Sequence, residues 1–259
     1  MVDQLGREIN LKNTPKRIVC LVPSLTELLV DLGLSDQLCG VTKFCVHPEN
    51  LKDQKTVVGG TKSIHIDRIK ALKPDFILCN KEENTQEIVA ACEQIAPVYV
   101  SDINDFDAFY TLVSNLGVLL NCQPKAKALN SAVKNRFAQF RKGVAAAPTR
   151  NVLYLIWRNP LMAAGRATFI NILLEACKFN NVIIEQDSRY PEVDLELLKK
   201  ADFVLLASEP FPFSEKHKAE FESELEAQIL CVDGEYFSWY GSRLLKAFDY
   251  FERLLLEMH

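Results

Sequence analysis

Residues that could bind a metal ion or another ligand gather in short loops that follow apolar runs. The segment 44–47 (FCVH) places a thiol and an imidazole two residues apart. Both groups bind metal ions, but a closed metal site needs about four ligands, and no other ligand clusters with these two. The segment 58–63 (VGGTKS) contains adjacent glycines, which predict a tight turn. Its spacing does not match that of a phosphate-binding loop, but its backbone N–H groups could still contact a ligand.

Aromatic rings and guanidinium groups share three further loops. Trp157 and Arg158 follow an apolar run, and Arg189 and Tyr190 precede a helical pattern. The segment 236–243 (YFSWYGSR) combines four aromatic residues with an arginine. Such residues also pack cores and rims, but the two tryptophans come just after predicted strands, where α/β proteins bind ligands. Flat rings and guanidinium groups would suit a large, partly planar ligand with anionic or amide edges.

No catalytic set accompanies these residues. The chain has four histidines and contains neither G-x-S-x-G nor H-E-x-x-H. Ser24 and Glu27 have the spacing of a capping box at a helix N-terminus. Glu82 and Glu83 are adjacent and would point apart on a helix, so we interpret them as a solvated helix start. The sequence therefore predicts a protein that is not an enzyme.

Short apolar runs and longer amphipathic patterns alternate along the chain, which predicts an α/β fold. The runs are rich in Val, Ile and Leu and do not strictly alternate, as is typical of parallel strands buried on both faces. The predicted strands are 18–22, 37–41, 76–79, 98–100, 152–156, 182–184, 203–206 and 229–232. The predicted helices are 24–32, 85–95, 106–119, 168–177, 214–226 and 242–256.

The segment Pro124–Lys142 has no strand pattern and predicts one long helix, about 30 Å in length at 1.5 Å per residue. It separates two sets of four predicted strands. The stretch 66–78 in the first set resembles 193–205 in the second, with matching Asp, Lys and apolar positions. We therefore expect two similar α/β lobes, 1–122 and 147–259, with a bridging helix within 123–146.

The overall composition is that of an ordinary globular protein. Acidic residues exceed basic residues and give a formal net charge of −4, which does not favour binding to nucleic acid by charge alone. No apolar run is long enough to span a membrane, and the first residues lack the apolar segment of a secretory signal. The eight cysteines form no C-x-x-C pair, and Cys20, Cys79 and Cys231 lie in apolar runs, so we expect buried thiols in a reducing compartment.

Several of these motifs together resemble a known family. They are 17–33 (RIVCLVPSLTELLVDLG), 41–49 (VTKFCVHPE), 58–63 (VGGTKS), 69–80 (IKALKPDFILCN) and 232–244 (VDGEYFSWYGSRL). In this order they resemble the class III substrate-binding proteins of ABC importers, within the helical-backbone metal receptor superfamily. Cobalamin (vitamin B12) receptors are the most similar type. The resemblance implies two lobes joined by one helix, with the ligand in a cleft between the lobes and no cofactor required.

The resemblance also implies which residues contact the ligand and the permease. The expected ligand contacts are Ser24, Thr26, Phe44, Cys45, His47, Gly60, Thr61 and Lys62 in the first lobe, and Trp157, Arg158, Tyr190, Trp239, Tyr240 and Arg243 in the second. One acidic residue on each lobe, Asp67 and Glu196, would pair with arginines of an ABC permease. Asp67 is shorter than the glutamate usual at its position.

These observations predict a monomeric binding protein that holds a metal chelate, above all a corrinoid such as cobalamin. Ferric siderophores or haem are alternative ligands. A second alternative is direct binding of a metal ion through Cys45 and His47, with a carboxylate such as Glu82, and a third is a cytoplasmic enzyme that uses the same cleft. As the chain stands we expect a cytoplasmic protein, or a periplasmic one if an export signal has been removed.

Overall fold

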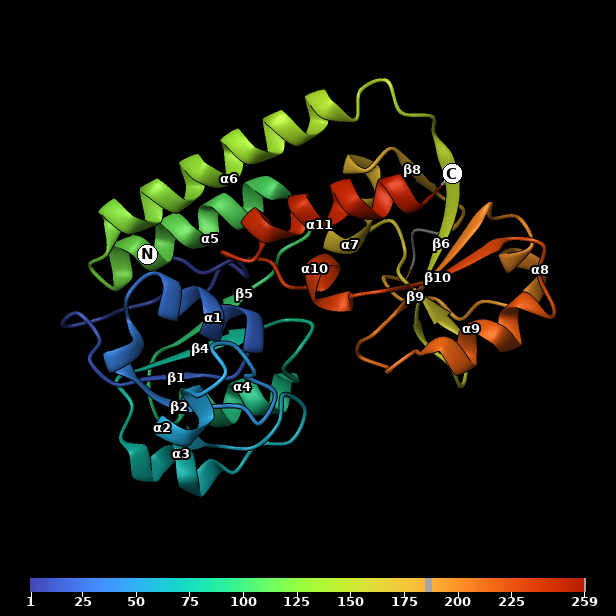
Figure 1. Cartoon of the computed structure of the whole chain (residues 1–259). Coiled ribbons are helices and arrows are strands. Elements are labelled where there is room, and N and C mark those ends of the chain that lie inside the picture. The colour runs from blue at the N-terminus through green and yellow to red at the C-terminus, as the bar shows by residue number, and fades with distance from the viewer. Residues whose placement is uncertain (185–187, 259) are drawn as a thin grey trace. The chain divides into compact units, whose positions relative to one another are not determined.

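The computed structural model describes residues 1–184 and 188–258, and it divides the chain into two compact units (Figure 1). The first unit comprises Met1–Val133 and Tyr240–Arg243, and the second comprises Lys134–Trp239 and Leu244–His259. The boundary falls inside the predicted central helix. The short segment Tyr240–Arg243, which we expected in the C-terminal lobe, belongs to the first unit.

A five-stranded parallel sheet forms the centre of the first unit, with the strand order β3-β2-β1-β4-β5. Its strands are β1 (Ile18–Cys20), β2 (Leu38–Val41), β3 (Thr56–Val57), β4 (Phe76–Asn80) and β5 (Val98–Ser101). Its helices are α1 (Pro23–Asp31), α2 (Leu51–Gln54), α3 (Ile66–Leu72), α4 (Gln86–Glu93) and α5 (Phe106–Leu119), with a short 3₁₀ turn η1 (Ser35–Gln37). Because β1 and β4 are central and covered on both faces, their residues are buried throughout.

Helices cover both faces of this sheet. Side chains alternate between the two faces along a strand, so neighbouring residues pack against different helices. Ile77 of β4 lies in one apolar cluster with Ile69 of α3 and Ile88 of α4. On the opposite face, Asn115 of α5 donates a hydrogen bond to the hydroxyl of Tyr99 in β5 (3.1 Å). The predicted parallel sheet covered by helices is thus confirmed for the first unit.

The second unit contains a five-stranded sheet in which β6 is central. The strand order is β10-β9-β6-β7, and β8 also pairs with β6; all pairs are parallel except β6 with β7. Its strands are β6 (Arg150–Trp157), β7 (Met162–Ala163), β8 (Phe179–Asn181), β9 (Phe203–Ala207) and β10 (Gln228–Val232). Its helices are α7 (Phe169–Ala176), α8 (Leu195–Leu198), α9 (Glu215–Glu222), α10 (Gly234–Ser238) and α11 (Leu244–Glu257).

Both faces of the second sheet are also covered. Leu155 of β6 and Leu206 of β9 pack with Phe221 of α9 in one apolar cluster. On the opposite face, the ring of Tyr154 lies 4.9 Å, centroid to centroid, from that of Phe237 in α10. The predicted fold class, α/β with two parallel-sheet lobes, is therefore confirmed.

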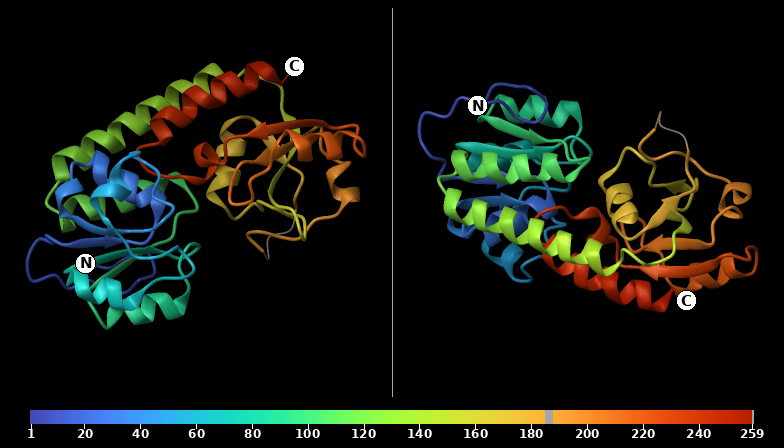
Figure 2. Two further views of the ribbon diagram at one scale, coloured as in Figure 1. Left: turned by 60° about the horizontal axis from the view of Figure 1, so that its bottom comes forward. Right: turned by 90° about the horizontal axis from the view of Figure 1, so that it is seen from above.

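The predicted central helix is α6 (Gln123–Gly143), which passes from the first unit into the second. Within the second unit its C-terminal half lies alongside α11 (Figure 2). The ring of Phe140 is 5.4 Å from that of Phe248, and Arg136 forms ion pairs with Asp249 (2.6 Å) and Glu252 (2.8 Å). Aromatic packing and paired charges thus join α6 to the last helix of the chain.

The internal repeat has a structural counterpart in each unit. Asp75, just before β4, accepts hydrogen bonds from the backbone N–H groups of Lys16 and Arg17 ahead of β1 (both 2.8 Å). Asp202, just before β9, accepts a hydrogen bond from the backbone N–H of Asn151 in β6 (2.8 Å). In both sheets a repeat aspartate therefore ties the start of one strand to the start of its parallel neighbour.

Two predictions about individual residues and elements are wrong, and two short strands were missed. Residues 182–184 are not a strand, because β8 ends at Asn181 and Ile184 is exposed. Cys231 is exposed, because it lies near the end of β10, which is an edge strand of the second sheet. The two-residue strands β3 and β7 were not predicted at all, since two residues carry no recognisable pattern.

Candidate functional site

The carboxyl ends of β1, β2, β3 and β4 meet at one edge of the first sheet, because these strands are parallel. In open α/β sheets this edge is the usual place for a ligand. The first turns of α1 and the loops after β2 and β3 contain all eight contacts predicted for the first lobe: Ser24, Thr26, Phe44, Cys45, His47, Gly60, Thr61 and Lys62. We call this region the carboxyl edge of the first unit.

Four side chains of the loop after β2 are accessible at this edge. Phe44 is 48% exposed, and the Lys43 ammonium lies 4.9 Å from the centroid of its ring. Val46, which the sequence did not single out, is also exposed, and His47 is half-buried. Phe44, Val46 and His47 therefore offer an apolar and aromatic surface that can contact a ligand.

Cys45 and Thr26 lie beneath that surface, and both are completely buried. The Cys45 thiol donates to the Thr26 hydroxyl (3.3 Å) and lies 3.4 Å from the Thr42 hydroxyl, while Thr26 donates to the carbonyl of Val22 (2.9 Å). Burial raises the pKa of the Cys45 thiol. A neutral, buried thiol is a poor metal ligand, so these side chains support the loops that carry the accessible residues.

The described part of the chain, 1–184 and 188–258, contains no group of three or more His, Cys, Asp or Glu residues that could hold a metal ion. Among these described residues, no carboxylate therefore joins Cys45 and His47 to complete such a group. The burial of Cys45 also counts against the predicted direct ligation, and we do not pursue it.

The predicted capping box at Ser24 is wrong. Helix α1 begins at Pro23, whose ring already holds the φ angle of a first helical residue, and no side chain caps it. Ser24 is therefore within the first turn and remains largely buried at the carboxyl edge. Glu27 turns instead to Arg243 of the same unit, with Nε–Oε2 and Nη2–Oε1 distances of 2.9 Å. Arg243 is thus already neutralised by a carboxylate.

The segment that carries Arg243 packs closely on α1 within the first unit. Gly241 has a φ of +137°, and a Cβ built there would lie 3.5 Å from the carbonyl oxygen of Ser24. Tyr240 is buried. Tyr240 and Arg243 therefore pack against α1 and are little accessible to a ligand.

Two asparagines that the sequence analysis missed organise the turn after β4. The Asn84 amide donates to the carbonyls of Leu21 (3.3 Å) and Thr61 (3.0 Å), and its oxygen accepts from the Asn80 backbone (2.9 Å). Both side chains are buried. Asn84 thus ties the end of β1 and the glycine turn to the β4 loop. An asparagine at the end of an apolar strand and again four residues later was the available signal.

Glu82 and Glu83 lie on this turn and not at a helix start. The Asn80 side-chain oxygen accepts from their backbone N–H groups (2.8 and 3.1 Å), and α4 begins later, capped by Thr85. Glu83 is half-buried, and burial raises its pKa against the opposing effects of a Thr61 hydrogen bond and the Lys62 charge. The interpretation of Glu83 as a solvated residue is therefore wrong, because it lies against the glycine turn.

In the second unit, Trp157 is the most accessible of the predicted aromatic contacts. It ends β6, is 40% exposed, and donates its indole N–H to the carbonyl of Asn159 (3.1 Å). The ring of Phe211, in the loop after β9, meets it edge-on at 5.7 Å, and the His217 ring lies 5.3 Å beyond. The Glu209–Ser214 segment (EPFPFS) was the signal for Phe211, which the sequence analysis overlooked.

The other predicted contacts of the second unit are already engaged. Trp239 is only 7% exposed and donates its indole N–H to Glu209 (2.8 Å), which also accepts from Ser238 (2.5 Å). Arg158 forms an ion pair with Glu220, and Tyr190 is half-buried. Trp239 therefore helps to hold the loop after β10 in place, whereas Trp157 can meet a ligand.

The two acids predicted to dock a permease occupy equivalent places. Asp67 is the second residue of α3, and Glu196 is the second residue of α8. Both are exposed, and Glu196 forms an ion pair with Lys199 of the next helical turn (2.6 Å). Their role in docking stays a prediction.

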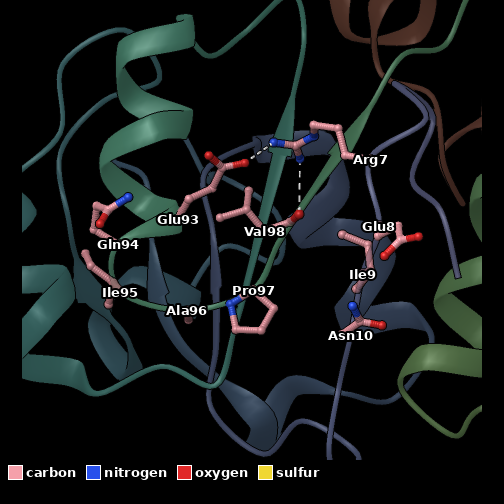
Figure 3. A pocket seen from close by; sticks show the side chains of 10 residues that line it. All are labelled: Arg7, Glu8, Ile9, Asn10, Glu93, Gln94, Ile95, Ala96, Pro97 and Val98. Atoms are coloured by element: carbon pink, nitrogen blue, oxygen red, sulfur yellow. Dashed lines mark hydrogen bonds and ion pairs between the residues drawn. The ribbon is translucent and has the colours of Figure 1, made fainter.

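A separate hollow lies at the amino end of β5, away from the carboxyl edge (Figure 3). Its volume is about 400 Å³, and it is lined by residues 7–10 and 93–98. Arg7 crosses it and bonds to Glu93 (2.5 Å) and to the carbonyl of Val98 (3.1 Å). Since its charged groups bind one another and no predicted contact lies there, we place the candidate site at the carboxyl edge.

Comparison with known proteins agrees with this geometry. The family model named "Periplasmic binding protein" matches residues 18–226. The chain belongs to this family. A member from Bacillus subtilis, the uncharacterized ABC transporter substrate-binding lipoprotein YvrC, is 24% identical over 95% of this chain and 82% of its own. The vitamin B12-binding protein of Pectobacterium carotovorum is 25% identical over 90% of this chain and 86% of its own.

Solved structures of similar proteins share the fold. The periplasmic vitamin B12-binding protein BtuF of Vibrio cholerae superimposes with a TM-score of 0.81 at 19% identity, covering 95% of this chain and 98% of its own. A periplasmic heme-binding protein from Pseudomonas aeruginosa also gives 0.81, at 22% identity, covering 93% and 92%. The resemblance seen in the sequence is thus confirmed. These relatives and structural neighbours are named as binding proteins and not as enzymes, and vitamin B12 or heme is what their names say they bind.

Proposed function

We propose that the chain is the substrate-binding component of an ABC importer and that it binds a metal chelate, above all a corrinoid such as cobalamin. One observation carries the choice of ligand. Relatives named vitamin B12-binding proteins match nine-tenths of the chain, at 24–25% identity. The accessible residues at the carboxyl edge, Phe44 and His47, and Trp157 of the second unit suit a large ligand with apolar faces.

Haem is the second candidate ligand, because solved family members include heme-binding proteins with TM-scores of 0.77 to 0.81. Ferric siderophores are a third, since one structural neighbour is named as a possible iron-binding protein. We rank both below corrinoids, since several relatives that match nine-tenths of the chain are named for vitamin B12.

We further propose that the partner is an ABC permease and that the protein works in the periplasm or at the outer face of a membrane. The family description and the lipoprotein relative favour this location over the cytoplasmic alternative. Among the described residues, no helix is long and apolar enough to cross a membrane. Asp67 and Glu196, exposed at equivalent helix starts, are the residues that we propose for docking.

Isothermal titration of the purified protein with cyanocobalamin, haemin and ferric citrate tests the proposal. We expect saturable binding of cyanocobalamin with a stoichiometry of about one, as for a single built site. Tighter binding of haemin or of ferric citrate than of cyanocobalamin would identify that chelate as the ligand, and the protein would still be a binding protein for a metal chelate. Absence of binding to all three would overturn the proposed function.

A further inference from the structure

The cationic side chains near the candidate contacts are largely committed to partners within the protein. In the first unit, Arg243 is paired with Glu27 (2.9 Å) and Lys81 with Asp102 (2.6 Å). In the second unit, Arg158 is paired with Glu220. An anionic ligand gains most from cations that lack such partners, so these pairs reduce the attraction for carboxylate-bearing chelates.

The remaining charges at the carboxyl edge balance. Lys43 and Lys62 are exposed there and the Lys52 ammonium donates to the carbonyl of Lys43, while the loop after β2 contributes Glu49 and the turn after β4 contributes Glu82 and Glu83. The ammonium of Lys62 donates to the backbone carbonyl of Glu82, which places it beside this turn. The edge therefore does not present a net positive field to a ligand.

Glu83 occupies a fixed position among these groups. The turn beneath it is held by the buried Asn80 and Asn84, whose hydrogen bonds reach β1 and the glycine turn. Its carboxylate accepts a hydrogen bond from Thr61, which is itself buried, yet Glu83 keeps part of its surface exposed. A carboxylate in a supported turn loses little conformational freedom when a ligand binds.

The chemistry of a fixed carboxylate separates the candidate ligands. An ionised carboxylate only accepts hydrogen bonds, so it pairs with the N–H groups of primary amides. It repels another carboxylate, and this repulsion grows where water is partly excluded. The rim of a corrinoid carries primary amides, whereas haem carries two propionates and ferric hydroxyacid chelates carry further carboxylates.

We propose that Glu83 determines ligand specificity at the carboxyl edge, by accepting hydrogen bonds from the amide groups of a neutral chelate and rejecting chelates that present a carboxylate there. This proposal rests on the proposed function, since it assigns the substrate class of the same site. It adds a residue and a selection rule that the fold alone does not supply.

The test compares two probes that differ in one group. Cyanocobalamin and its monocarboxylic acids, in which one side-chain amide is hydrolysed to a carboxylate, are titrated calorimetrically into the wild type at pH 8. We expect at least one monocarboxylate to bind about tenfold more weakly than cyanocobalamin. A tenfold ratio of dissociation constants corresponds to about 1.4 kcal/mol of binding free energy. In Glu83→Gln the ratio of the two dissociation constants should fall to about two or less, because the glutamine side chain accepts hydrogen bonds but does not repel a carboxylate.

Two further variants control for shape and for overall charge. Glu83→Asp keeps the charge and should keep most of the discrimination, even if both affinities fall. Glu224→Gln removes a charge from an exposed residue of the second unit and should leave the ratio unchanged. Circular dichroism of each variant verifies folding, and Glu83→Ala, which also lacks the carboxylate and should also lose the discrimination, keeps the test decisive if Glu83→Gln does not fold.

The outcomes separate this inference from the proposed function. If the wild type binds cyanocobalamin, but a variant without the Glu83 carboxylate discriminates against the monocarboxylate as strongly as the wild type does, the role of Glu83 is overturned and the proposed function stands. Tighter binding of haemin than of cyanocobalamin by the wild type would also overturn it. If the wild type binds neither cyanocobalamin nor haemin nor ferric citrate, the proposed function itself fails.

Discussion

Glu27 and Arg243 lie 216 positions apart in the chain, and their side chains form a two-pronged ion pair inside the first unit. Both side chains are about 90% buried, which removes most of their hydration. The pair fixes Tyr240–Arg243, a short segment between α10 and α11, onto α1. The same glutamate would have completed a capping box had α1 begun two residues later, at Leu25, but it binds instead the segment that leads to the last helix.

Removal of either partner should strongly destabilise the first unit. Arg243→Met or Glu27→Leu leaves a buried charge without its partner, and we expect a loss of about 3–5 kcal/mol in the free energy of unfolding. The double variant should recover most of this loss, because two apolar side chains replace two desolvated charges. Urea denaturation of both single variants and the double variant measures the coupling between them.

Lys199→Met provides the control for that cycle, because the Lys199–Glu196 pair is exposed. Its removal should cost about 0–1 kcal/mol. Single-variant losses as small as this control would mean that the Glu27–Arg243 pair contributes nothing specific to the first unit.

Asn84 should be the most sensitive polar residue of the carboxyl edge. Asn84→Ala leaves the carbonyls of Leu21 and Thr61 without their amide donor, and the backbone N–H of Asn80 without its acceptor. We expect a loss of about 1–3 kcal/mol in the free energy of unfolding. Asn135→Ala, at an exposed position of α6, should be nearly neutral in the same urea titration. Equal stability of the two variants would contradict the organising role of Asn84.

The fold was predictable where the physical signal is local. Long apolar runs gave β4, β6 and β9, and the 3.6-residue periodicity gave α5 and α6 to within one residue of their bounds. The two-residue strands β3 and β7 carry no period, so they were missed. Local patterns also placed the site loops at strand ends, where the parallel sheet then gathered them at one edge.

Contacts between distant residues were not predictable from local patterns. The pairing of Glu27 with Arg243 depends on tertiary packing, and a capping motif explained Glu27 equally well until Pro23 proved to begin α1. Cys45 looked like a ligand because its thiol and the His47 imidazole are two residues apart, but the packing of the loop turns its thiol inward. Side-chain direction within a loop is set by packing that the sequence does not display.

Alkaline conditions should weaken the first unit through its buried thiol at Cys20. Burial raises the pKa of Cys20 from 9.0 to about 12. The unfolded chain therefore releases this proton at lower pH than the folded protein does, so the thiol's contribution to stability is complete below pH 9 and is lost as the pH rises towards 12. Burial likewise raises the pKa of Tyr99 to about 12, which adds to the loss above pH 10.

Between pH 9 and pH 10, the Cys20 thiol alone should lower the free energy of unfolding by about 1 kcal/mol, as its raised pKa requires. Urea midpoints at pH 7, 9 and 10 measure the decline. In Cys20→Ala the decline between pH 9 and pH 10 should be smaller by about this amount, whatever the stability of this variant at pH 7, because the other buried thiols keep their own contributions. An identical pH profile for the variant and the wild type would rule out the thiol as its source.

The two tryptophans of the second unit should separate into one that binds and one that supports the fold. Trp157 is exposed, so Trp157→Ala should weaken cyanocobalamin binding by about 1–3 kcal/mol and leave the urea midpoint nearly unchanged. Trp239 is buried and donates to Glu209, so Trp239→Ala should lower the free energy of unfolding by about 3–5 kcal/mol. Calorimetric titration and urea denaturation of both variants distinguish the two roles. Unchanged affinity in Trp157→Ala would remove this ring from the binding site.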